Sequence, residues 1–171
     1  MVGSLLKKEQ EAKDKAYMES YRIFGKPATK AGAGYAYVEE PMVPGFIRRN
    51  ARNQRADSVV EVSEDSMLPA YHNGELVYVE DTEDGYPGED VVCSTADGMI
   101  IKQLLPGRKL RSINPELPYG EKSEDNHVNI ICRVIGIVAP EYFATTEEIS
   151  ILNDIFDEEI QDFYKTHGVA N

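Results

Sequence analysis

Apolar and polar residues alternate through the middle of the chain, in short runs that glycine and proline separate. The alternation predicts strands over 58–63, 75–80, 90–95, 99–105, 109–113 and 128–138. The breaks between them fall at Gly74, Gly85–Gly88, Gly98, Gly107 and Pro115. Because this period leaves little room for helices, residues 57–140 are predicted to form a mainly β domain.

Both ends of the chain follow a helical pattern instead. Residues 4–22 favour helix with a thin apolar stripe, which is typical of a linker helix or a partner-bound helix. Residues 145–165 place apolar side chains on one face after a Thr145-x-x-Glu148 capping box. This helix is expected either to cover the core or to dock a partner.

Residues 25–56 separate the first helix from the β region. They are rich in glycine, alanine and proline up to residue 45, which predicts extended or loop structure, and then in arginines that should be exposed. The predicted organisation is therefore a linker helix at 1–24, a loop region at 25–56, the β domain at 57–140 and an acidic helical extension at 141–171.

Size and charge narrow the classes of function. The 171 residues suit about one domain, and the net charge is −12. Residues 57–100 hold twelve acidic residues and no lysine or arginine, so this chain alone should bind nucleic acid poorly. The simplest interpretation of the acidity is solubility.

Cysteine and hydropathy patterns indicate the compartment. Cys93 and Cys132 each lie in an apolar run and are expected to be buried thiols rather than a disulfide. No apolar run approaches the roughly 18 residues of a membrane span, and the first residues lack a signal-peptide pattern. These features predict a cytoplasmic protein without membrane association.

One serine interrupts the strand pattern. Ser66 lies in a polar, turn-like break at 64–69, and a serine hydroxyl attacks a carbonyl only when a base takes its proton. The three histidines, His72, His127 and His167, are in turn, loop or tail context and are expected at the surface.

A lysine is the alternative base. Lys102 is the only lysine or arginine between Glu64 and Gly107, on the strand face of Ile100 and Leu104. A lysine acts as a base when burial without a counter-charge keeps its amine neutral. The same position also suits an edge-strand lysine that prevents aggregation.

Several motifs together resemble one family. The stretch EDSMLP at 64–69, followed by HNGE at 72–75, resembles the serine box G-[DE]-S-M-x-P…G-[DE] of the S24 peptidases. DGMIIKQL at 97–104 resembles the lysine box, and RSINP at 111–115 and VIGIV at 134–138 resemble later motifs. S24 domains are the self-cleaving C-terminal domains of LexA-type and phage CI-type repressors and of UmuD-like polymerase subunits. The resemblance covers roughly residues 25–140 and implies their β fold, with helices flanking it here.

The resemblance implies a catalytic dyad and a cleaved bond. Ser66 would be the nucleophile, Lys102 the base, and the backbone N–H groups of Asp65 and Ser66 would stabilise the oxyanion. The chain would cut itself at Ala31-Gly32, with Ala33-Gly34 as the alternative. The same stretch also suits a flexible linker. No metal and no cofactor are expected.

The resemblance also implies partners. We expect a homodimer formed through an exposed strand near 130–138, and a RecA-type filament, or another inducer or antirepressor, as co-protease. DNA would be bound only through a helix-turn-helix domain, which the residues before the cleavage loop cannot hold. The function expected is that of the autoproteolytic C-terminal domain of a LexA- or CI-like repressor that responds to SOS-type DNA damage.

Alternatives remain open. The chain could be a non-catalytic dimerisation module, a UmuD-like polymerase accessory subunit, or a signal-peptidase relative, against which the lack of a membrane anchor counts. Glu64 stands where the S24 motif usually has glycine, and the helix at 145–165 extends past the usual end of the domain.

Overall fold

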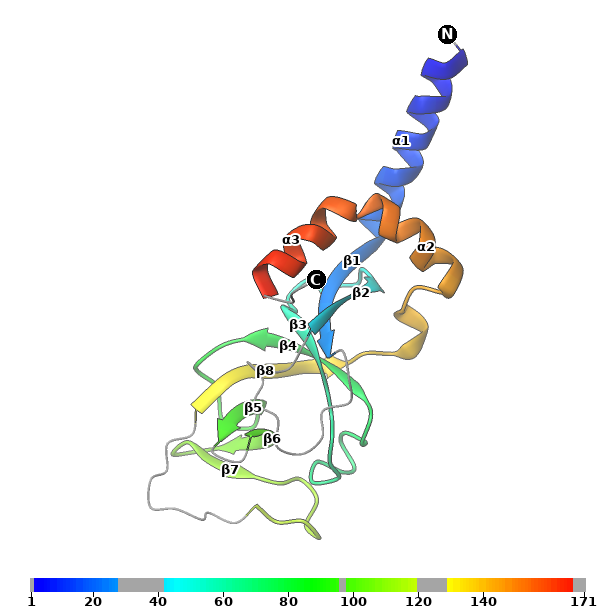
Figure 1. The fold of residues 1–171 in the computed structure, drawn as a ribbon. Helices are drawn as coiled ribbons and strands as arrows, with labels where there is room; N and C mark the ends of the chain where they lie inside the picture. The colour runs from blue at the N-terminus through cyan, green and yellow to red at the C-terminus, as the bar shows by residue number, and fades with distance from the viewer. Residues whose placement is uncertain (1, 28–41, 96–97, 120–128, 168–171) are drawn as a thin grey trace.

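The structure is a computed structural model and describes residues 2–27, 42–95, 98–119 and 129–167. Within them, one eight-stranded sheet has the strand order β2-β1-β3-β4-β8-β5-β6-β7. Its strands are β1 (Tyr21–Pro27), β2 (Met42–Arg48), β3 (Ser58–Glu61), β4 (Leu76–Asp81), β5 (Asp90–Thr95), β6 (Gly98–Leu105), β7 (Lys109–Arg111) and β8 (Asn129–Ile137). The helices are α1 (Val2–Ser20), α2 (Thr146–Ile155) and α3 (Asp157–His167), with a 3₁₀ turn at Pro140–Tyr142 (Figure 1). The predicted fold class, mainly β with helices at both ends, is confirmed.

The six strands predicted from alternation correspond to β3–β8, although β3 and β7 each end earlier than predicted. The pattern missed β1 and β2, which form an antiparallel hairpin where helix and loop were predicted. Tyr21 and Phe24 of β1 are buried by this pairing and by distant segments, so their strand state depends on tertiary contacts. The arginines at 48–55 are exposed, as predicted.

The strand that was expected to be exposed lies inside the sheet. β8 pairs with β4 on one side and with β5 on the other, both antiparallel. β4 pairs with residues 132–137 of β8 and β5 with residues 129–133, so both backbone edges are occupied only near Cys132 and Arg133, and the prediction of an exposed strand near 130–138 is not contradicted over 134–137. Among the described residues, no strand pairs with 134–137 on the side of β5, and Ile137 is 39% exposed.

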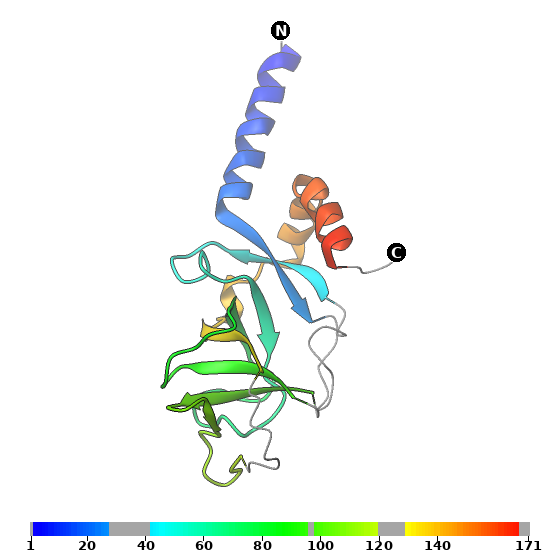
Figure 2. The ribbon, with the colours of Figure 1, turned by 90° about the vertical axis from the view of Figure 1, so that its left-hand side faces the viewer.

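The C-terminal segment covers the β1–β2 hairpin. It forms two helices rather than the single helix predicted, because the backbone leaves the helical conformation at Phe156. The Thr145–Glu148 capping box is present at the start of α2. Leu152 and Phe156 pack against Tyr21 and Phe46, with the two phenylalanine ring centroids 5.6 Å apart. Figures 1 and 2 show both helices beside the hairpin from two directions.

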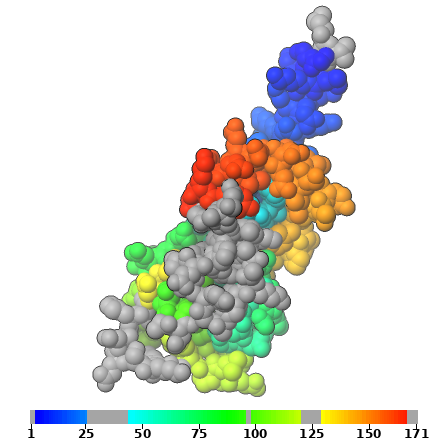
Figure 3. Space-filling view, in the orientation of Figure 1, coloured from blue at the N-terminus to red at the C-terminus, as the bar shows by residue number. Residues whose placement is uncertain are grey.

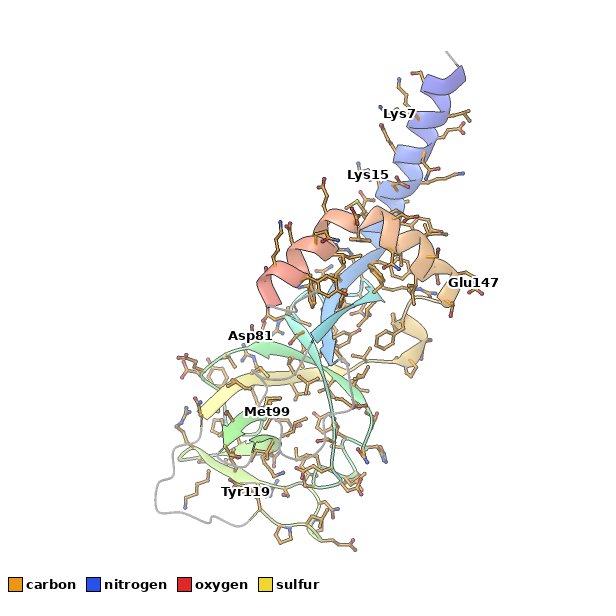
Figure 4. All side chains as sticks on the ribbon, viewed as in Figure 1. Lys7, Lys15, Asp81, Met99, Tyr119 and Glu147 are labelled. Carbon is orange, nitrogen blue, oxygen red and sulfur yellow. The ribbon has the colours of Figure 1, made fainter. Side chains whose placement is uncertain are left out.

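Helix α1 projects from the body of the molecule, as Figures 1, 2 and 3 show. Leu5 and Leu6 on it are 65% and 60% exposed. The labelled side chains of Lys7 and Lys15 extend from this helix into solvent (Figure 4). Only the last turns, near Tyr17 and Met18, pack against the cluster under α2 and α3. Among the described helices, none combines the length and the apolar character needed to span a membrane.

Both cysteines are free and buried, as predicted. Burial raises the pKa of the Cys93 thiol to about 11, and it raises the pKa of the Cys132 thiol to about 12, against an ordinary value of 9.0. Both thiols are therefore protonated in the folded protein at neutral and mildly alkaline pH.

This burial predicts a loss of stability at alkaline pH. Between pH 9 and 11 the unfolded thiols release protons that the folded thiols keep, so the free energy of unfolding falls as pH rises, by about 1.4 kcal/mol per thiol and pH unit. Urea unfolding at pH 8 and pH 10.5 measures this slope. A Cys93→Ala/Cys132→Ala variant should show a smaller slope, and equal slopes would contradict the prediction.

Candidate active site

A tight turn after β3 holds Ser66. The backbone N–H of Leu68 donates to the Asp65 carbonyl (3.2 Å), and that of Tyr71 donates to the Met67 carbonyl (3.1 Å). The Met67 side chain is 1% exposed and belongs to the central core cluster. Because the residue beside it is anchored in the core, the Ser66 side chain has a fixed position, and Ser66 is only 5% exposed.

Lys102 reaches this serine from β6. β5 pairs with β6 at Lys102, and β7 pairs with β6 only from Gln103 to Leu105, but the Lys102 side chain is buried, so the interpretation of Lys102 as an exposed edge-strand lysine is wrong. Lys102 is 3% exposed, and its Nζ donates a hydrogen bond of 2.8 Å to Ser66 Oγ. The structure thus brings together the two side chains that the sequence singled out, in a site largely closed to water.

A third side chain completes the cluster. Glu64 Oε1 accepts hydrogen bonds from Lys102 Nζ (2.8 Å) and from Ser66 Oγ (2.7 Å). The expectation that Lys102 is buried without a counter-charge is therefore wrong. Sequence reasoning noted Glu64 only as a departure from glycine, because alternation along strands does not tell where a side chain in a turn points.

The charge of Glu64 follows from this geometry. Burial by itself would raise the pKa of the carboxyl, but the hydrogen bonds from Lys102 and Ser66 outweigh it and hold the pKa below its ordinary value. The carboxylate is therefore ionised at neutral pH. Its side chain is 46% exposed, whereas that of Lys102 is 4% exposed, so water reaches the pair from the glutamate side.

Asn114 orients the turn that carries the serine. Its side-chain amide donates to the Asp65 carbonyl (3.0 Å), and its backbone N–H donates to the Ser66 carbonyl (2.9 Å). The Asp65 carbonyl and the Ser66 N–H belong to one planar peptide group and point in opposite directions. Asn114 therefore fixes the direction of the Ser66 N–H. The motif at 111–115 contained this residue, but the sequence assigned it no role.

A hollow of about 440 Å³ lies beside the dyad. It is lined by Leu105, Leu110, Arg111, Ser112, Ile113, Asn114, Pro115, Pro118 and Tyr119. The Tyr119 ring centroid is 5.8 Å from Lys102 Nζ. Figure 4 shows Tyr119 at the end of the molecule opposite α1. The hollow adjoins the dyad through Asn114, which donates to the Ser66 carbonyl, and through Tyr119.

The predicted cleavage-site residues and one histidine cannot be placed relative to the dyad. Ala31, Gly32, Ala33 and Gly34, in the sequence between β1 and β2, and His127, in the sequence between β7 and β8, are outside the described residues. His72 is exposed in the turn before β4, as predicted, and His167 is the last residue of α3.

A family model described as Peptidase S24-like matches residues 23–135. The chain belongs to this family. S24 proteins are serine peptidases, and the matched range contains Ser66, Lys102, Glu64 and Asn114. The S24 match ends before α2 and α3, so the helices that cover the hairpin lie outside it. A comparison with curated proteins gives no match.

Proposed function

We propose that this S24 protein is an autoproteolytic serine endopeptidase that cuts its own Ala31-Gly32 bond, with Ala33-Gly34 as the alternative. The observation that carries the proposal is the 2.8 Å contact between Lys102 Nζ and Ser66 Oγ in a buried site. A serine alcohol beside a buried lysine amine is one of the recurring ways to make a nucleophile.

The chemical steps follow from these two groups. With its amine neutral, Lys102 takes the hydroxyl proton while Ser66 Oγ forms a bond to the carbonyl carbon of residue 31. The Ser66 N–H, fixed by Asn114, and the Asp65 N–H would donate to the oxyanion. Lys102 then protonates the amine of residue 32 as the peptide bond breaks. Water hydrolyses the resulting ester and regenerates Ser66.

The sheet topology favours an intramolecular reaction. The segment with the proposed bond leaves the end of β1 at Pro27 and returns at Met42, the first residue of β2. Substrate and nucleophile therefore share one fold, and no association step limits the rate. Control rests on how often the segment occupies the site, which is a population equilibrium.

The biological setting belongs to the same proposal. The chain would act as the C-terminal self-cleavage and dimerisation domain of a LexA- or CI-like repressor. A RecA-type filament, or another inducer or antirepressor, would favour the state with the segment in the site. A UmuD-like accessory subunit of a polymerase would use the same chemistry with a different partner.

One observation supports a second candidate. The carboxylate of Glu64 contacts Lys102 Nζ at 2.8 Å and favours its charged form, which cannot accept a proton. If Lys102 stays charged, the chain cannot cut itself, and it would act as a non-catalytic dimerisation module of a repressor.

Self-cleavage is tested with the purified full chain. We expect incubation at pH 7–10, with and without a RecA filament, to yield two fragments whose masses place the break between residues 31 and 32, or 33 and 34. The rate should rise with pH, because alkaline conditions favour a neutral amine. Intact mass spectrometry over time gives the rate and the bond. An intact chain under all these conditions would support the dimerisation module.

A further inference from the structure

The hydrogen bonds around Lys102 Nζ match a charged amine. Nζ donates to Glu64 Oε1 (2.8 Å), Ser66 Oγ (2.8 Å) and the Ile101 carbonyl (3.2 Å). An ammonium group has three N–H donors, whereas a neutral amine has two donors and one lone pair. Glu64 Oε1 and the Ile101 carbonyl can only accept, whereas a hydroxyl such as Ser66 Oγ can also donate, so the contact with the Glu64 carboxylate at 2.8 Å is what favours the ammonium, which has no lone pair for a proton.

The hydroxyl proton of Ser66 has two competing acceptors. In the structure it is donated to Glu64 Oε1 at 2.7 Å, so it points away from Lys102. For Lys102 to act as a base, the same proton has to turn toward Nζ. Glu64 thus opposes the reaction in two ways. It favours the charged form of Lys102, and it accepts the hydrogen bond of the Ser66 hydroxyl, which has to be donated to Lys102 Nζ for the reaction to begin.

Glu64 is itself a weak base here. Its hydrogen bonds from Lys102 and Ser66 hold its pKa below the ordinary value, so it has little tendency to remove a proton from an alcohol. The carboxylate orients the hydroxyl without activating it.

The other titratable groups near Lys102 do not replace this carboxylate. Cys93 on β5 is kept protonated by burial, which raises its pKa to about 11. Asp90, also on β5, accepts a hydrogen bond of 2.6 Å from the Tyr71 hydroxyl. Tyr119 presents its ring to Nζ. Among the described residues, Glu64 is the carboxylate in contact with the amine.

We propose that Glu64 inhibits the Ser66–Lys102 dyad, because its carboxylate favours the charged form of Lys102 and accepts the hydrogen bond of the Ser66 hydroxyl, and that the dyad becomes active when the carboxylate turns away from the amine. We call this inhibitory contact of Glu64 the latch. The inference rests on the proposed function and describes the regulation of the same site. Ser66 and Lys102 are buried, but the Glu64 side chain is 46% exposed and can turn into water without disturbing the core. Glycine, usual at this position of the motif, has no side chain to form such a latch.

The pH profile of self-cleavage tests the latch. Glu64→Gln keeps the shape and the hydrogen-bonding oxygen of the side chain and removes its charge. In the full chain we expect it to move the rise of the cleavage rate to lower pH by about one unit or more, which means about a tenfold faster reaction at pH 7. The rate at the alkaline plateau should stay close to that of the unaltered chain. Glu83→Gln, which removes one exposed acid between β4 and β5, is the matched control and should leave the profile in place.

The outcomes separate the latch from the proposed function. If the unaltered chain cuts itself and the Glu64→Gln profile superimposes on it, the latch is wrong and the peptidase stands. If Glu64→Gln is slower at every pH, Glu64 assists the reaction, and the latch is equally wrong. If neither chain cuts under any condition, the peptidase proposal fails, and the latch is judged on the charge of Lys102 alone.

The charge of the Lys102 amine can be measured without a cleavage assay. In the Ser66→Ala background, which cannot form an acyl-enzyme, the carbon NMR shift of Lys102 Cε reports whether the attached amine carries its third proton. We expect Ser66→Ala/Glu64→Gln to lose this proton at lower pH than Ser66→Ala does. Identical titrations of the two variants would overturn the latch whatever the cleavage assay shows.

Discussion

Ser66→Ala is expected to abolish fragment formation at every pH, and Lys102→Met is expected to slow it by about 10²–10⁴-fold, the usual contribution of a general base. Alanine removes the atom that attacks the carbonyl, so no change of pH can restore the reaction. Methionine fills the volume of a lysine side chain that is only 4% exposed and removes the amine. Intact mass spectrometry of chains incubated from pH 7 to 10 measures both effects.

Matched variants separate the chemistry from the fold. Ser63→Ala lies three residues before the nucleophile, and Lys109→Met removes an exposed lysine of β7, so both should cut like the unaltered chain. Lys102→Met should stay folded, because Glu64 is accessible to water and is not left as a buried charge. Continued cleavage of a folded Ser66→Ala chain at the same bond would exclude Ser66 as the nucleophile.

Strands β3–β8 were predictable because each is a short run of apolar positions bounded by turn residues. In β4 and β5, consecutive residues are buried on both faces, yet their β-branched residues and flanking turns still indicated strands. The β1–β2 hairpin gave no such signal. Tyr21 and Phe46 are buried by Leu152 and Phe156, more than a hundred positions away, and a local pattern does not contain that contact.

In the candidate site, too, some residues were predictable from the sequence and others were not. The motifs indicated Ser66 and Lys102, and the fold places them in contact, because strand pairing sets the position of β6 and Met67 anchors the serine turn. The carboxylate of Glu64 and the orienting bonds of Asn114 depend on side-chain directions in two irregular segments. These directions appear only when the segments are packed together.

Cutting the chain between β1 and β2 is expected to leave its two parts associated. The N-terminal part would keep α1 and β1, and β1 pairs with β2 at seven positions from Tyr21 to Pro27. Tyr21 and Phe24 are 3% and 1% exposed, and each should contribute about 1.5–3 kcal/mol by its burial. The Tyr21 hydroxyl also donates to Glu148 of α2. The parts should therefore co-elute in native size-exclusion chromatography and separate in urea.

The test does not depend on self-cleavage, because a protease site inserted between β1 and β2 of the Ser66→Ala chain makes the same break. Phe24→Ala should weaken the association, since it removes a ring that packs against Tyr78 in the core, with ring centroids 5.8 Å apart. Leu5→Ala, on the exposed part of α1, is the control and should change nothing. If the N-terminal part elutes alone in native buffer, the C-terminal helices and β2 do not hold it. If it stays bound, breaking the bond does not by itself free α1, and a further step that opens the hairpin is needed for its release.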